Sequence, residues 1–171
     1  MNSAWLRGAL MGLGLAPVLL LGTAAWAQII ETRVSPLTAL DRQYMDQQRQ
    51  SVAGLTLRYY GGRCCRREAE LDYLQRLLDD RYVRDEDREL LQAMGIALGD
   101  LLADELDLRW VIYEDAEGRS RALQLDQTEN FLFPVTMISR RRESGDRTPI
   151  TEVYQQAVEA MQAAKPPLPF Q

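Results

Sequence analysis

The chain has 171 residues, of which 46% are hydrophobic and 26% charged, with 20 Lys and Arg residues against 25 Asp and Glu residues. A chain of this length corresponds to about one domain, which excludes a multidomain enzyme and a large transmembrane bundle. It contains no histidine, and this excludes histidine-based acid/base catalysis, Ser-His-Asp or Cys-His nucleophiles and metal sites with imidazole ligands.

Residues 1–27 have the pattern of a secretory signal peptide. Arg7 is followed by a long apolar run without charge, which closes on Ala-Trp-Ala, a small-x-small sequence that a signal peptidase accepts. The alternative is a membrane anchor, since the run approaches the length that spans a bilayer. Because no basic stop-transfer cluster follows, we expect cleavage before Gln28. The mature protein would then be periplasmic or secreted in a bacterium, with no membrane attachment.

The mature chain is acidic. Arg7 is the only charged residue of the leader, so its removal changes the net charge from −5 to −6. This charge gives no electrostatic reason to expect nucleic acid or an anionic membrane as a partner. The sequence also carries no spacing of residues that indicates a cofactor or a metal ion.

Three helices are predicted first in the mature chain. The first covers residues 35–60, with Ser35 as its N-cap and Pro36 at the first helical position, and it ends at a pair of glycines. The second covers about residues 67–80. The third is capped by Asp85 and runs to about Leu106, and its wide apolar stripe predicts the central buried helix.

The period of the pattern then changes from that of a helix to that of a strand. Residues 108–115 and 119–125 are predicted strands of a hairpin whose loop ends in Gly118. Residues 131–138 are predicted as a third strand. Pro134 within it cannot donate to a ladder, which makes this strand an edge strand or a bulge.

The chain ends with a predicted helix that starts near Thr148 and with a proline-rich tail, residues 165–171, that we expect to be extended. The order is therefore three N-terminal helices, a three-stranded antiparallel meander packed on the central helix, and one C-terminal helix. This predicts a single α+β domain over residues 28–164.

Gly95 and Gly99 lie one turn apart in the third predicted helix, and charged residues flank them, which favours close core packing over transmembrane dimerisation. The strand Trp-Val-Ile-Tyr-Glu-Asp and the sequence Phe-Pro-Val-Thr-Met-Ile-Ser follow. With these motifs, residues 88–142 resemble the bacterial family known as domain of unknown function 3806. The resemblance implies one folded unit, and it implies no activity, cofactor or catalytic residue.

Cys64 and Cys65 are adjacent in the chain. A disulfide between them would close a strained eight-membered ring, so we expect no ordinary structural bridge. Three arginines beside them would favour the reactive thiolate in an oxidising compartment, which makes the pair a redox candidate or a source of intermolecular disulfides. The alternative is two incidental loop residues.

Arg140, Arg141 and Arg142 follow the third predicted strand. Three guanidinium groups can bind a phosphate or a carboxylate, and Arg119 and Arg121 of the second strand would join them if all five lie on one side of the sheet. The alternative is a solvated run of charge, which the acidic residues nearby favour.

Both faces of the predicted sheet are partly apolar. One face carries Trp110 and must pack on the central helix. We assign Val111, Tyr113 and Leu132 to the second face, which either lies under other helices or forms a partner surface.

These observations predict an exported, non-enzymatic protein that binds another envelope protein or a second copy of itself, such as an inhibitor or an assembly factor. The alternative is a small envelope enzyme or anion-binding protein that works with carboxylates, Tyr and Arg alone.

Overall fold

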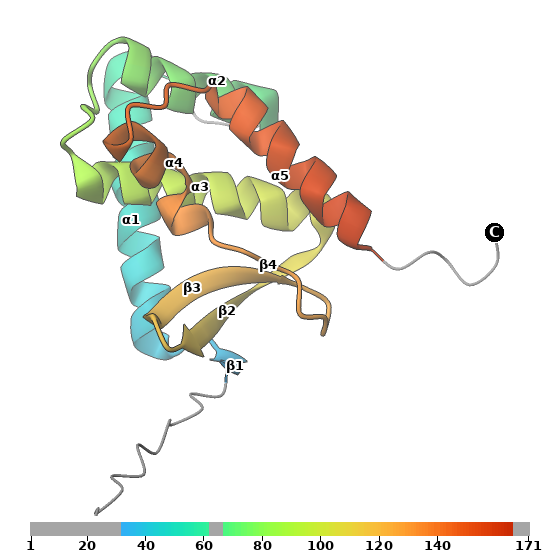
Figure 1. Ribbon diagram of the computed structural model, residues 1–171. Coiled ribbons are helices and arrows are strands. Elements are labelled where there is room, and N and C mark those ends of the chain that lie inside the picture. The colour runs from blue at the N-terminus through green and yellow to red at the C-terminus, as the bar shows by residue number, and fades with distance from the viewer. Residues whose placement is uncertain (1–31, 62–66, 166–171) are drawn as a thin grey trace, which may run out of the picture.

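The computed structural model describes residues 32–61 and 67–165. Within these ranges the chain forms four strands and five helices, an α+β fold (Figure 1). In chain order they are β1 (Arg33–Pro36), α1 (Ala39–Tyr60), α2 (Arg67–Asp79), α3 (Arg88–Leu106), β2 (Leu108–Asp115), β3 (Gly118–Leu125), β4 (Phe131–Leu132), α4 (Pro134–Glu143) and α5 (Ile150–Ala164). The predicted signal peptide (residues 1–27), Cys64, Cys65 and residues 166–171 of the tail lie outside the described residues.

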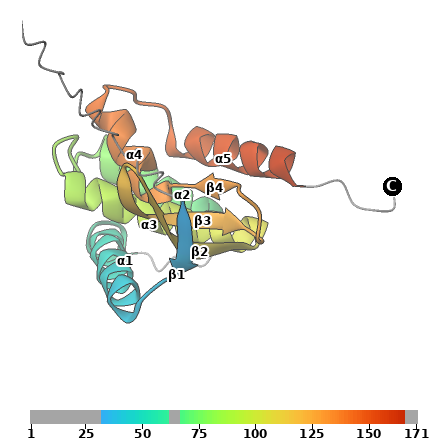
Figure 2. The ribbon, with the colours of Figure 1, turned by 60° about the horizontal axis from the view of Figure 1, so that its bottom comes forward.

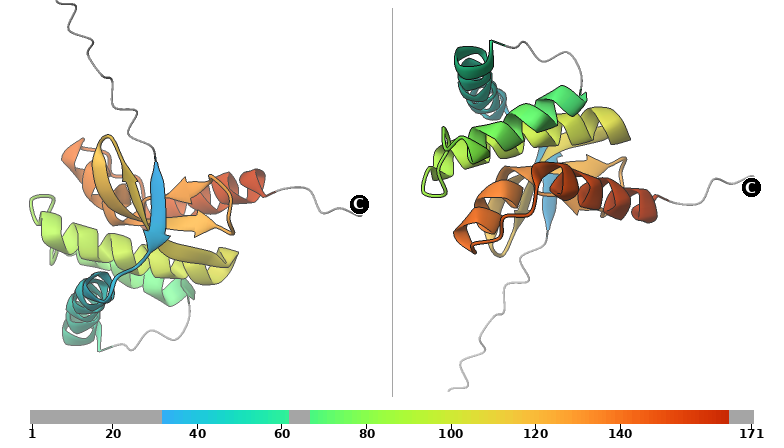
Figure 3. Two further views of the ribbon diagram at one scale, coloured as in Figure 1. Left: turned by 90° about the horizontal axis from the view of Figure 1, so that it is seen from below. Right: turned by 90° about the horizontal axis from the view of Figure 1, so that it is seen from above.

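The helices cover one face of the sheet. The strands form one antiparallel sheet in the order β1-β2-β3-β4. Seen from below, the sheet lies in front of the helices, and seen from above, α2 and α5 lie in front of α3 and the sheet (Figure 3). We call the face toward α3 the inner face and the opposite one the outer face. Leu108, Trp110 and Leu123 belong to the inner face and pack into the main core.

The start of the first helix differs from the prediction. Residues 33–36 form β1, which pairs with β2 and leads directly into α1 (Figure 2). The N-cap is Thr38, whose hydroxyl accepts from the backbone N–H of Asp41 at 3.2 Å, while the Asp41 carboxylate accepts from the Thr38 N–H at 3.1 Å. Ser35 and Pro36 match the local signals of a helix start, but pairing with β2 requires extended backbone, which proline allows in an edge strand.

The hairpin is confirmed. β2 and β3 pair along their full length, from Leu108 opposite Leu125 to Asp115 opposite Gly118. Gly118 has a φ of 128°, which favours glycine, and the Asp115 carboxylate accepts from the backbone N–H groups of Glu117 and Gly118 at 2.8 and 3.1 Å. Local turn chemistry therefore determines this element.

The predicted strand over residues 131–138 is wrong beyond its first two residues. Only Phe131–Leu132 pair with β3, and α4 begins at Pro134. At the first position of a helix the missing N–H of proline is not needed, so Pro134 starts α4 instead of interrupting a strand. The predicted three-stranded meander is thus a four-stranded sheet, with β1 at one edge and β4 at the other. Helix α4 is an additional helix, so the described residues form five helices where four were predicted.

Helix α3 is the central helix, as predicted, but its N-cap is Asp87 and not Asp85, so the helix begins at Arg88. Leu91, Met94, Ile96, Leu98 and Leu102 are fully buried. A Cβ at Gly95 would overlap the carbonyl groups of Pro134 and Val135, and one at Gly99 would lie 2.5 Å from the indole ring of Trp110. The glycine spacing therefore serves close packing of α3 on α4 and β2.

Candidate functional site

Three aromatic rings meet on the outer face of the sheet. Tyr113 of β2 lies 4.9 Å from Phe131 of β4 and 5.3 Å from Phe133, measured between ring centroids. Because β3 separates β2 from β4, the rings meet across β3. We call Tyr113, Phe131 and Phe133 the aromatic cluster. Edge-to-face contacts of this kind stabilise beyond simple area burial.

The outer face carries little charge and no described helix covers it (Figure 3, left). Val34, which pairs with Tyr113, is 39% exposed and Phe133 is 37% exposed. On β2 the charged residues of this face are Arg109 and Asp115, near its two ends. The centre of the face is therefore neutral and partly apolar.

The residues that sequence reasoning assigned to this face divide between the two sides. Val111 and Tyr113 do lie on the outer face, where Val111 is 6% exposed. Leu132 pairs with Leu123, so it lies on the inner face and packs against the main core. Phe131, not assigned as a site residue, takes its place, and the alternation within Phe-Leu-Phe was the signal that could have identified it.

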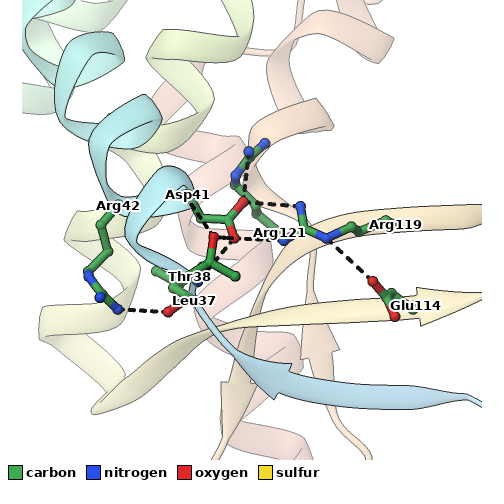
Figure 4. Close-up of polar contacts among 7 residues, drawn as sticks. All are labelled: Leu37, Thr38, Asp41, Arg42, Glu114, Arg119 and Arg121. Carbon is green, nitrogen blue, oxygen red and sulfur yellow. Dashed lines mark hydrogen bonds and ion pairs between the residues drawn. The ribbon is translucent and has the colours of Figure 1, made fainter.

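Arg119 and Arg121 both bind the buried carboxylate of Asp41 (Figure 4). Arg119 donates two hydrogen bonds to Asp41, at 3.0 and 2.6 Å, and Arg121 donates one at 2.9 Å. Asp41 is 2% exposed. The hydrogen bond from Arg119 holds the pKa of Asp41 well below its usual range, against the opposite effect of burial.

This polar cluster joins the first turn of α1 to β3. Arg119 also lies 3.4 Å from Glu114, and the Arg121 guanidinium lies over the ring of Tyr44 at 4.2 Å from its centroid. Two guanidinium groups thus surround one carboxylate that is itself part of the helix cap. An external anion at this point would have to displace Asp41.

Arg140, Arg141 and Arg142 lie in the last turn of α4 and not at the end of a strand. Arg141 donates to the backbone carbonyl of Met137 at 2.9 Å and lies 3.7 Å from Asp146. Arg142 lies 3.7 Å from the carboxylate of Asp85, and Arg140 is exposed. The two groups of arginines therefore interact with different acidic residues.

Within the described residues no group of three Asp, Glu, Cys or His side chains is placed to hold a metal ion. Among the described helices, none is long and apolar enough to cross a bilayer.

Comparison with known proteins gives a family and a fold. Residues 70–154 match the family described as "Domain of unknown function (DUF3806)", which extends the resemblance seen over residues 88–142 in both directions. A crystal structure of a Bacteroides thetaiotaomicron VPI-5482 protein is similar, with a TM-score of 0.68 and 16% identity. The match covers 75% of this chain and 47% of that one, and it shows a shared fold. No curated protein matches the sequence.

Proposed function

For this chain, which belongs to the DUF3806 family, we propose the function of an exported, non-enzymatic protein-binding module of the cell envelope. Its binding surface is the outer face of the sheet around the aromatic cluster. The observation that carries this proposal is the exposed Phe133 beside Tyr113 on a face without a covering helix among the described residues. The expectation of export rests on the pattern of residues 1–27.

The aromatic cluster on the uncharged part of the outer face resembles the core of a protein interface. Tyr, Trp and Phe are enriched in interface cores, where charged residues are depleted. The outer face matches this composition, because Tyr113 lies on β2 between Arg109 and Asp115, the two charged residues of this strand on the outer face. A contiguous apolar patch exposed to water also has a free-energy cost that a partner removes.

The composition of the face defines the chemistry of the partner. The partner protein presents an uncharged apolar surface, since a charged one would lose hydration without gaining an ion pair at the centre of the face. The edge of the sheet is a poorer contact. β1 has four residues and contains Pro36, and short strands with proline resist the addition of a further strand.

The geometry favours this function over anion binding. Arg119 and Arg121 already bind the buried carboxylate of Asp41. An anion-binding protein needs guanidinium groups that a ligand can reach without displacing such a partner.

The test compares the protein with its Phe133→Ser variant. Proteins of an envelope extract from its own source would be captured on each, and one that needs Phe133 would be purified and its affinity measured. We expect Phe133→Ser to weaken that affinity by about tenfold or more. The matched control is Leu40→Ser, because Leu40 is an exposed apolar residue of α1 at 77% exposure.

Equal affinity for the protein and for Phe133→Ser would show that the partner binds elsewhere. Sedimentation of the purified protein distinguishes another envelope protein from a second copy of this chain as the partner. A dimer that Phe133→Ser dissociates would identify a second copy of this chain as the partner. A monomer that captures nothing dependent on Phe133 would overturn the proposal.

A further inference from the structure

A groove with a volume of about 550 Å³ lies between α1, α2 and α3, away from the outer face of the sheet. Its walls are largely apolar: Val52 and Leu57 come from α1, Leu74 from α2, and Ala97 and Leu101 from α3. Leu57 is 54% exposed although it is a large apolar side chain. Small-molecule sites have this size and character, with mostly apolar walls and a few polar groups that orient the ligand.

The positive charge that lines the groove is already compensated. Arg49 donates to both carboxylate oxygens of Asp100, at 2.6 and 2.8 Å, and to Asp46 at 2.7 Å. Asp100 also accepts from the indole N–H of Trp110 at 3.0 Å. Arg49 therefore offers little attraction to an anionic ligand.

Glu70 is different. It lines the groove and is half-buried, and in the described part of the chain it has neither a hydrogen bond nor an ion pair. Burial raises the pKa of Glu70, and the carboxylates of Asp104 and Asp100 raise it further. An acidic group held in such surroundings gains from any cation that enters the groove.

Gly54 leaves one wall of the groove open. It is in the interior of α1, where glycine weakens a helix relative to alanine. A Cβ built at Gly54 meets no other atom within 4 Å, so the position has no packing reason to be glycine. A larger residue there would extend into the space that Gly54 lines.

We propose that this groove binds a small apolar molecule that carries a single positive charge, and that the carboxylate of Glu70 pairs with that charge. The apolar walls bury the body of the ligand. Asp100, the other carboxylate that lines the groove, is already bound by Arg49 and Trp110, which leaves Glu70 to pair with the cation. This site is separate from the outer face of the sheet and uses none of its residues.

The test is calorimetric titration of the purified protein with three probes of equal chain length, each below its micellar concentration: decyltrimethylammonium, decyl maltoside and decanoate. We expect the ammonium probe to bind more tightly than the other two. Glu70→Gln should lower the affinity for the ammonium probe about tenfold, because pairing with a charged group contributes about this much to binding. The affinity for the neutral probe should stay unchanged.

A second variant locates the site. Gly54→Leu should abolish binding of every probe by filling the groove, while Ser51→Leu, an exposed position of α1 outside the groove, should leave binding unchanged. If Gly54→Leu melts at a lower temperature than the protein itself, Ala53→Leu provides another way to fill the same space. The proposal is overturned by tighter or equal binding of decanoate, by unchanged ammonium binding in Glu70→Gln, or by full binding in both filled variants.

Discussion

The indole ring of Trp110 lies against Gly99, so close that a Cβ on the glycine would be 2.5 Å from the ring. Trp110 is on the inner face of β2 and Gly99 is in α3, so this contact sets how closely the central helix approaches the sheet. The indole N–H then reaches Asp100, the next residue of the helix, at 3.0 Å. One aromatic residue thus combines apolar packing with a polar contact.

Two Gly→Ala substitutions should act in opposite directions. Gly99→Ala should lower the free energy of unfolding by about 1–3 kcal/mol, because the added methyl group must displace the Trp110 ring and Pro134. Gly54→Ala should raise it by about 0.5–1 kcal/mol, since the methyl group meets open space and alanine favours the helix. Urea unfolding measures both. A stabilising Gly99→Ala would contradict the close packing of Gly99 against the Trp110 ring.

Removing the Trp110 side chain should cost far more than changing the outer face. Trp110→Ala is expected to destabilise by about 3–5 kcal/mol through the cavity that it leaves, enough to unfold a marginal domain. Phe133→Ser should change stability by about 1 kcal/mol or less, because Phe133 is 37% exposed. Thermal unfolding followed by circular dichroism compares the two. Similar losses in both variants would assign Phe133 to the core.

Asp41→Asn should destabilise by about 2–4 kcal/mol at neutral pH, because two guanidinium groups lose their buried partner. The pKa of Asp41 is lowered on folding, so its ionised form stabilises the fold above its ordinary value of 3.8. This contribution is lost as the pH falls below that value toward the folded pKa. The stability difference between the protein and Asp41→Asn should therefore shrink below pH 3.8.

Unfolding by urea at neutral pH and at several acidic pH values tests this dependence. Asp87 and Asp146 also have lowered pKa values, from hydrogen bonds donated by Arg84 and by Thr148 respectively. Since both remain in the variant, subtracting its stability from that of the protein isolates Asp41. A difference that stays constant with pH would show that the Asp41 carboxylate is not selectively stabilised by its partners.

Export with cleavage of the predicted signal peptide would change the mass of the protein. The mass of the protein recovered from the envelope or the medium of its own source should correspond to a chain that begins at Gln28. Ala27→Leu should block processing, because the peptidase requires a small residue at that position. Recovery of the uncleaved chain from the cytoplasm would exclude the predicted export.

Elements with strong local signals were predictable. The hairpin of β2 and β3 has alternating residues and a turn in which Asp115 and Gly118 satisfy the geometry locally. The core position of α3 follows from its apolar stripe, and the end of α1 follows from Gly61, whose φ is 64°. In each case the residues that decide the structure lie within a few positions of one another.

Residues 131–138 show why a local pattern was insufficient. The alternation in this segment fits a strand, and Pro134 fits either an edge strand or the first turn of a helix. The structure has a helix because Pro134 and Val135 pack against Gly95 of α3, some forty residues earlier in the chain. The same arrangement brings Phe133 to the outer face beside Tyr113.

The candidate sites depended almost entirely on distant contacts. The sequence by itself determined the fold class, the hairpin, the central helix and the apolar character of both sheet faces, because periodicity and turn chemistry act between near neighbours. Only the tertiary structure decided that Arg119 binds Asp41, a residue 78 positions away, and that Glu70 lines a groove without a partner among the described residues. The physical reason is that burial and pairing of charges depend on which elements contact one another in the fold, and a local sequence pattern does not specify those contacts.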